Sequence, residues 1–229
     1  MKNQIVASIA ALPFALGTAF AGAGVANAAA LTGEFHIASG VSIPGGISNI
    51  FLTQDSLTFQ PIPTPVLVDP DPVNGGSFNG FNSALISEII SFSGNNVNNP
   101  FLDLGNSPTG PGIVMGAPDP SLTDGLNVFN LTEASYNLSQ TGANVSVDVA
   151  LWGYFESANG HTSKGAGSLT FQIINDTVAS VESQLASGET IGDITFSGGL
   201  FASTPEPTVL FGLGVVTAGL VASRRQKNS

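Results

Sequence analysis

The sequence predicts a mainly β protein, an antiparallel β-sandwich or jelly-roll-like domain with one short helix, flanked by an N-terminal signal peptide and a C-terminal transmembrane helix. First, apolar and polar residues alternate with a period of two through 143–175, as in a half-buried strand. Second, ten of the 14 prolines lie in 61–120 and none in 121–204, and proline disfavours the middle of a sheet. Third, the chain has no cysteine and is 42% hydrophobic, so a packed core must stabilise the fold without disulfides.

The first half of the predicted domain contains short strands. Apolar runs bounded by turn residues indicate strands over 35–43, 47–53 and 57–60. The segment 84–92 fits a helix or a strand equally well. The proline-rich stretch 61–76 is expected to lie across a sheet edge. There the missing N–H groups of proline cost no hydrogen bonds of the sheet, and the prolines block pairing with the edge of another sheet.

The second half contains the most regular sheet. Strands are predicted over 143–157 and 166–175, joined as a hairpin through Asn159-Gly160. A third strand is expected over 128–138, with Tyr136 and Leu138 on one face, and a fourth over 191–201. Since no fixed-period repeat occurs, a propeller or solenoid is disfavoured.

One short helix is expected between these strands. Asp176-Thr177 supplies an N-cap, Val178, Val181 and Leu185 form an apolar face, and Gly188 follows as a C-terminal glycine.

The charge distribution excludes whole classes of partner. The formal net charge is −11, and between residues 31 and 207 Lys164 is the one base against sixteen acids. A nucleic-acid binder needs a basic patch to neutralise phosphates, so no nucleic-acid partner is expected. Arginine-clamped phosphate chemistry is excluded too, because this stretch contains no arginine.

Residues 1–28 have the layout of a secretory signal peptide. Lys2 precedes a mostly apolar stretch, and Ala26-Asn27-Ala28 forms a small-x-small cleavage site. We expect cleavage after Ala28, with Ala26 and Ala28 as the recognised small residues. Retention as an uncleaved membrane anchor is the alternative.

Residues 204–229 form a second distinctive segment. Pro205 and Pro207 hold Glu206 in an extended, presented conformation. The uncharged run 208–223 would make a helix about 24 Å long, marginal for a bilayer core of about 30 Å. Arg224, Arg225 and Lys227 then form a basic stop that holds this end on the cytoplasmic side.

This tail resembles the PEP-CTERM sorting signal of Gram-negative bacteria and cyanobacteria. The resemblance implies that an exosortase, a membrane peptidase, recognises Pro205-Glu206-Pro207 after the secretion machinery has exported the chain. It also implies at least transient anchoring in the inner membrane, delivery to the cell envelope or outside the cell, and association with extracellular polysaccharide or biofilm material. Two other interpretations of the tail are a buried core strand and a Gly212-x-Gly214 nucleotide loop, which lacks the usual context of a preceding strand and a later acid.

Calcium is the one metal that the sequence suggests, and only weakly. Asp69 and Asp71 lie in one turn-rich segment and Asp119 and Asp124 in another, where oxygen ligands gather easily. The alternative is that Asp-Pro and Asp-Gly simply form good turns, so we predict no obligatory cofactor. The two histidines, His36 and His161, have no spacing that requires them to converge.

No catalytic constellation is evident, and we predict a non-enzymatic protein. Trp152, Tyr154 and Glu156 cluster near a strand end, which suggests a carbohydrate-binding domain as an alternative function. A secreted hydrolase is a further alternative and needs two converging carboxylates. The predicted organisation is therefore a signal peptide over 1–28, an exported β-rich domain over 29–203, and a sorting tail over 204–229 with its membrane span at about 208–223.

Overall fold

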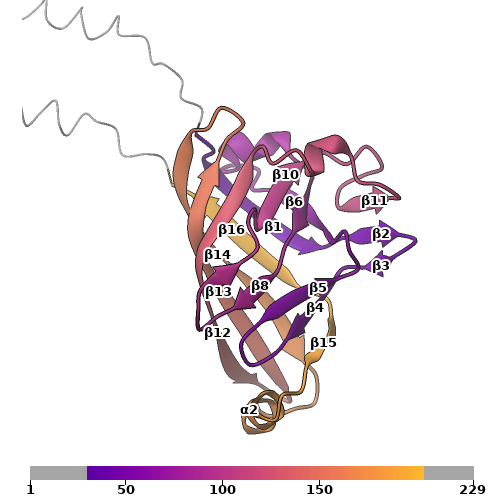
Figure 1. Cartoon of the computed structure of the whole chain (residues 1–229), viewed down its shortest axis with the longest axis vertical. Coiled ribbons are helices and arrows are strands. Elements are labelled where there is room, and N and C mark those ends of the chain that lie inside the picture. The colour runs from indigo at the N-terminus through magenta and orange to yellow at the C-terminus, as the bar shows by residue number, and fades with distance from the viewer. Residues whose placement is uncertain (1–29, 204–229) are drawn as a thin grey trace, which may run out of the picture.

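A computed structural model describes residues 30–203 of the chain (Figure 1). Its elements in chain order are β1 (Gly33–Ser39), β2 (Val41–Ile43), β3 (Gly46–Ile47), β4 (Asn49–Leu52), β5 (Leu57–Gln60), β6 (Pro65–Pro70), η1 (Gly76–Gly80), β7 (Ser83–Ile86), β8 (Ile89–Ser91), β9 (Asn96–Val97), β10 (Leu102–Gly105), β11 (Ile113–Met115), η2 (Pro120–Leu122), β12 (Val128–Thr141), β13 (Asn144–Glu156), β14 (Thr162–Ile173), α2 (Val178–Ala186), β15 (Ile191–Ile194) and β16 (Ser197–Ala202).

The largest sheet is a closed antiparallel barrel of eight strands. Its order is β1-β16-β14-β13-β12-β10-β7-β6, and β6 pairs with β1 to close the ring (Figure 1). The mainly β, antiparallel prediction is confirmed. The closure itself was not predicted: the sequence suggested a sandwich or jelly roll, because alternation shows which residues face inward but not which distant strands meet.

The long strands β12, β13 and β14 form the most regular wall of the barrel. The predicted hairpin 143–157/166–175 is confirmed by the continuous register from Val145 opposite Ile173 to Glu156 opposite Thr162. Val145, Val147 and Val149 are fully buried.

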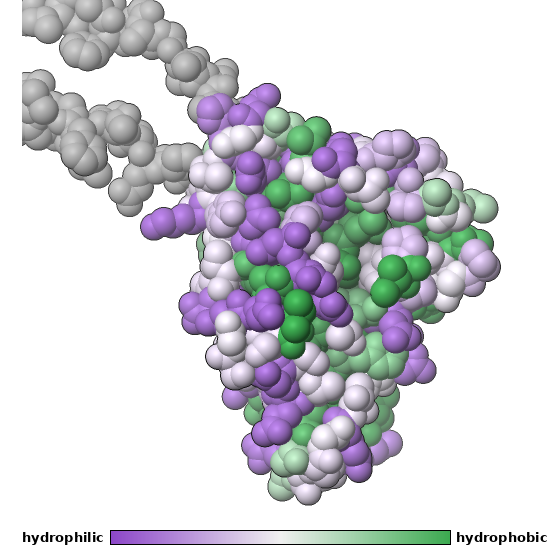
Figure 2. Space-filling model, viewed as in Figure 1, coloured by the Kyte–Doolittle hydropathy of each residue, from purple (hydrophilic) through white to green (hydrophobic). Residues whose placement is uncertain are grey.

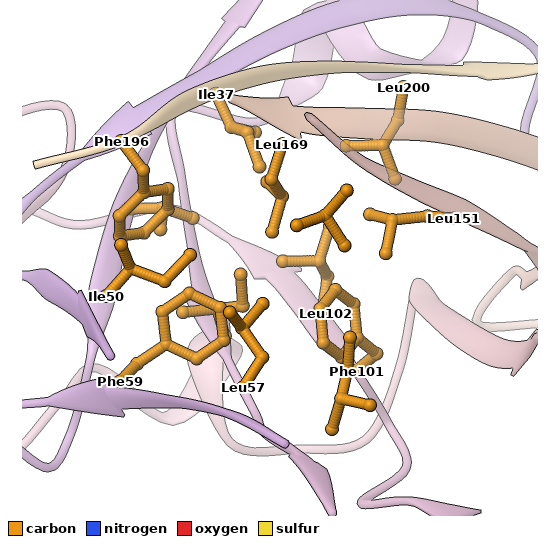
Figure 3. Close-up of a cluster of buried hydrophobic side chains, with 14 of the residues drawn as sticks. Ile37, Ile50, Leu57, Phe59, Phe101, Leu102, Leu151, Leu169, Phe196 and Leu200 are labelled. Atoms are coloured by element: carbon orange, nitrogen blue, oxygen red, sulfur yellow. The ribbon is translucent and has the colours of Figure 1, made fainter. Parts of the chain in front are cut away.

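A second sheet, of order β15-β4-β5-β8-β9, shares the barrel's core. In Figure 3, Ile50, Leu57 and Phe59 from this sheet point toward Ile37, Leu169 and other side chains from the barrel strands. At β10–β12 and β6–β7 the barrel strands pair over only a few residues. The apolar core is continuous between the barrel and the second sheet, so the two sheets form one folding unit.

Phenylalanines fill another part of the core. Phe35, Phe78, Phe129 and Phe155 contact one another with ring centroids 4.5–6.0 Å apart. Gly165 on β14 makes this packing possible, because a Cβ there would meet the Phe155 ring at 2.6 Å.

The expectation for the proline-rich stretch was wrong. Its strand, β6, lies between β1 and β7 inside the closed barrel rather than across an edge. Proline is tolerated because Pro65 and Pro70 are the first and last residues of β6. The Pro65 carbonyl still accepts from the Gly40 N–H and the Ser48 hydroxyl.

Two other segments divide into more elements than expected. The ambiguous 84–92 contains parts of two strands, β7 and β8, rather than a helix. The predicted strand 191–201 is two strands in different sheets, with Asp193 at φ 61° where the β15 register shifts.

The predicted short helix is confirmed as α2, the one α-helix among residues 30–203. The Thr177 hydroxyl accepts from the Ser180 N–H at 3.3 Å, which satisfies a donor of the first turn. Val181 and Leu185 are buried, and Gly188 follows at φ 87°.

Candidate functional site

The outer wall of the barrel carries exposed aromatic side chains in one row. The cross-strand register aligns Glu133, Trp152, Ala166, Phe201 and Glu34, from β12, β13, β14, β16 and β1 respectively. We call these five residues the aromatic row. Trp152 is 43% exposed and Phe201 49% exposed. The two aromatics are therefore displayed on the outside of the barrel, separated by the small side chain of Ala166.

Strand geometry explains why these large apolar groups face solvent. Successive side chains point to opposite faces of a strand. Since Leu151 and Phe155 are fully buried inside, Trp152 and Tyr154 must point outward. Trp152 is therefore not part of the packed core.

A β-bulge adds a second polar side chain beside Trp152. The register shifts between Leu131 and Glu133, so Thr132 and Glu133 are both exposed next to Trp152. The Thr132 hydroxyl donates to the Trp152 carbonyl at 3.1 Å. Gly153 is required here, because a Cβ would lie 2.1 Å from the Asn130 carbonyl oxygen.

A polar row runs beside the aromatic row. It consists of Ser168, Gly199, His36 and Asp69, which are aligned across β14, β16, β1 and β6. These residues line a hollow of about 600 Å³. The hollow exists because Ser197 and Gly199 on β16 carry little or no side chain, and the His36 ring lies 3.4 Å from the position a Gly199 Cβ would occupy.

The polar row contains the residue types of a hydrolytic triad but not its connections. Among residues 30–203, no hydrogen bond links the side chains of Ser168, His36 and Asp69. A nucleophile requires its base within hydrogen-bond reach. Glu156, the acid that the sequence places near Trp152 and Tyr154, lies opposite Val128 and Thr162, neither of which is acidic. The arrangement supplies hydroxyl, imidazole and carboxylate groups suited to binding.

A second hollow of about 440 Å³ adjoins the far end of the aromatic row. Glu34 and Phe201 line it together with Val73 and Asn74 from the turn after β6. The aromatic row therefore lies between two surface depressions. Elsewhere, Figure 2 shows hydrophobic residues on one face as separate groups among hydrophilic ones.

Three of the four candidate calcium ligands act as local turn caps. Asp71 accepts the N–H groups of Asn74 and Val73, and these bonds lower the pKa of its carboxyl. Asp119 accepts the Ser121 N–H, which likewise lowers its pKa. Asp124 accepts the Leu126 N–H at 2.8 Å.

The fourth candidate, Asp69, is exposed in the polar row opposite His36. Within residues 30–203, no group of three or more His, Cys, Asp or Glu side chains is placed to hold a metal ion. The prediction of no obligatory cofactor, with calcium as the alternative, stays a prediction.

One unusual carboxylate was not singled out from the sequence. Asp103 on β10 is only 7% exposed; its Oδ2 accepts the Gly125 N–H at 3.1 Å, and its Oδ1 has no partner among the described residues. Burial raises the pKa of Asp103 to about 6, and the charge of Asp124 adds to the effect. In the sequence Asp103 is the polar residue of the alternating run Leu102-Asp103-Leu104, a pattern typical of a side chain that faces solvent.

The remaining predicted residues lie outside the described part of the chain. These are the cleavage residues Ala26 and Ala28, the sorting motif Pro205, Glu206 and Pro207, and the membrane stop Arg224, Arg225 and Lys227. Within residues 30–203, no helix has the length and apolar character to cross a membrane.

Comparison with known proteins adds no relative. No family model matches the chain, and neither the curated proteins nor the solved structures include a match.

Proposed function

We propose that this chain is an exported, non-enzymatic envelope or extracellular-matrix protein, sorted by its C-terminal Pro-Glu-Pro motif. The sequence motifs at the two ends carry the proposal. One structural observation supports it: the first and last described strands are neighbours, with Gly33 opposite Ala202. Both the proposed signal peptide and the proposed sorting tail therefore attach at the same end of the barrel.

All strands of the barrel lie between the two proposed processing sites. The core cluster of residues 30–203 runs from Leu31 to Ala202. Removing the signal peptide after Ala28 and processing the tail near Pro207 would leave every strand of the barrel in place. An exosortase-type peptidase and the secretion machinery are the partners that this proposal requires.

Reporter fusions test the proposed topology. A reporter active only outside the cytoplasm, fused after Ser203, should be active, and the same reporter fused after Ser229 should be inactive. A cytoplasmic location of the Ser203 fusion would contradict export. Replacing Glu206 with Ala should block processing, while Glu189→Ala, an exposed acid on the barrel domain, serves as the matched control.

A second candidate function is carbohydrate binding by the barrel. The exposure of Trp152 and Tyr154 on the outer wall favours it, because tryptophan and tyrosine offer a large apolar face with a polar group and are enriched at recognition surfaces. The two functions are compatible, since binding to polysaccharide would retain an exported protein in the extracellular matrix. A secreted hydrolase has less support, because Glu133 lies opposite Trp152 in the strand register, four residues along β13 from Glu156.

A further inference from the structure

We propose that the aromatic row binds a neutral polysaccharide, with sugar rings stacked on Trp152 and Phe201 and the intervening sugar spanning Ala166. This inference rests on the carbohydrate-binding candidate above and specifies its site and ligand class. Phe201 was not among the residues suggested by the sequence. It joins the site only through the non-local pairing of β16 with β14.

The spacing of the two strands that carry the rings suits a linear chain laid across them. Trp152 and Phe201 are two strands apart, which places their backbones about 9.6 Å apart at the usual strand spacing of about 4.8 Å. A pyranose residue in an extended chain advances by about one strand spacing. Every second sugar would then meet an aromatic face, and Ala166 leaves room for the sugar between.

The groups around the rings match sugar hydroxyls. Glu133 and Glu34 lie at the two ends of the row, each one strand beyond an aromatic side chain. Carboxylates accept hydroxyl hydrogen bonds, and such charge-assisted bonds are stronger than neutral ones. Ser168, His36 and Asp69 in the adjoining hollow, with Lys164 opposite Tyr154, add further donors and acceptors.

Charge selects a neutral polymer over an acidic one. Lys164 is the only base between residues 31 and 207, and acidic residues close both ends of the row. A polyanion would be repelled by this surface and find no arginine to pair with.

The barrel fixes the backbone that carries both aromatic residues before any ligand binds. Both aromatics lie on strands paired on each side, and the bulge at Thr132 and the glycine at 153 fix the backbone around Trp152. A rigid site loses little conformational entropy on binding.

The sole tryptophan of the chain provides a direct probe. Because Trp152 is in the proposed site, its fluorescence should shift to shorter wavelength when a sugar ring covers it. We would titrate the full chain, purified in a mild detergent, with dextran, laminarin and hydroxyethyl cellulose as neutral polymers and alginate as the anionic one. Affinity electrophoresis in gels containing each polymer gives an independent readout.

We expect at least one neutral polymer to shift the emission and retard the protein, and alginate to do neither. Phe201→Ala and Ala166→Gln should each weaken the retardation by about tenfold, the latter by filling the gap between the rings. Trp152→Phe should retain most of the binding, and Trp152→Ala should lose it. Ile174→Ala removes a 72% exposed apolar side chain outside the row and should change nothing.

Circular dichroism and thermal melting would verify that each variant folds. Ala166→Gln removes no side-chain contact of the folded protein, so we expect it to fold. It therefore tests the inference even if Trp152→Ala fails to fold. Three outcomes would overturn the inference: no response to any neutral polymer, binding to alginate alone, or concentration-dependent self-association that Trp152→Ala abolishes. None of them bears on export and sorting, which the reporter fusions test separately.

Discussion

Asp103 is the residue whose environment departs most from that of a surface carboxylate. Its Oδ1 is buried and has no hydrogen-bond partner among residues 30–203, and its pKa is raised to about 6 because burial disfavours the charged form. A carboxyl whose pKa is higher in the folded than in the unfolded state stabilises the fold below its ordinary pKa, 3.8 for Asp103. That contribution is lost as the pH rises through about 6.

We therefore predict that Asp103→Asn flattens the pH dependence of stability between pH 4.5 and 7. In the unmodified chain, the contribution of Asp103 should lower the melting temperature as the pH rises across this range. Thermal melts followed by circular dichroism at several pH values would measure both slopes. Asp148→Asn, at an exposed position, is the control. Equal slopes for the Asp103 variant and the unmodified chain would contradict the assignment.

The carboxylates that cap turns have the opposite effect on the pH dependence of stability. Hydrogen bonds lower the pKa values of Asp55, Asp71, Asp119 and Asp176, so the stability they contribute is present above the ordinary carboxyl pKa and lost as the pH falls below it. Melts below pH 4 should therefore show a decline that Asp103→Asn leaves unchanged.

At the scale of elements, the β12–β13 pair depends on its bulge. Gly153 faces the Asn130 carbonyl so closely that any Cβ would force the backbone to shift. We predict that Gly153→Ala destabilises the protein by about 1–3 kcal/mol, the usual range for overpacking. Urea unfolding would measure the change. Gly80→Ala, where a Cβ meets nothing within 4 Å, should have a small effect, and similar effects for both variants would refute the role given to Gly153.

The elements also show which parts of the fold a sequence reveals. The β13–β14 hairpin and helix α2 were predictable because their signals are local: alternation, a turn, an N-cap and a C-terminal glycine. The position of β6 was not predictable in this way. Proline-rich composition argues against a strand inside a sheet, but prolines at the two ends of β6 are compatible with its place between β1 and β7. The division of 191–201 depends on which sheet each half joins, and local pattern carries no such information.

The candidate site was predictable only in part for the same reason. Trp152 and Tyr154 were noticed because they follow the strongest alternating strand. Phe201 and Glu34 were not, since strands distant in the sequence bring them into one row with Trp152. Glu133 was not, since the bulge before it shifts the β12 register. Asp103 was missed because its burial depends on the backbone around Gly125, twenty-two residues later.

At the scale of the whole molecule, acidity should limit stability at low salt. Between residues 30 and 203 the carboxylates greatly outnumber Lys164, and like charges repel in the compact state. We predict that sodium chloride raises the melting temperature at pH 7, with most of the gain reached by about 0.15 M, where the screening length is about 8 Å.

We expect calcium to affect the stability of the protein only by screening its negative charges, as any salt does. Asp71, Asp119 and Asp124 already accept backbone N–H groups, and they lie in two separate turns. We predict that calcium raises the melting temperature no more than magnesium at the same concentration. A larger, saturable rise with calcium that a chelator reverses, and that Asp71→Asn or Asp119→Asn removes, would establish a calcium site instead.

We propose that both ends of the chain are sorting signals and that the barrel between them is the exported protein. Mass spectrometry of the termini of the protein recovered from the cells that produce it tests both signals at once. We expect an N-terminus at residue 29, after Ala28, and a C-terminus at or shortly after Pro207. A mature protein that retains both Met1 and Ser229 would contradict it.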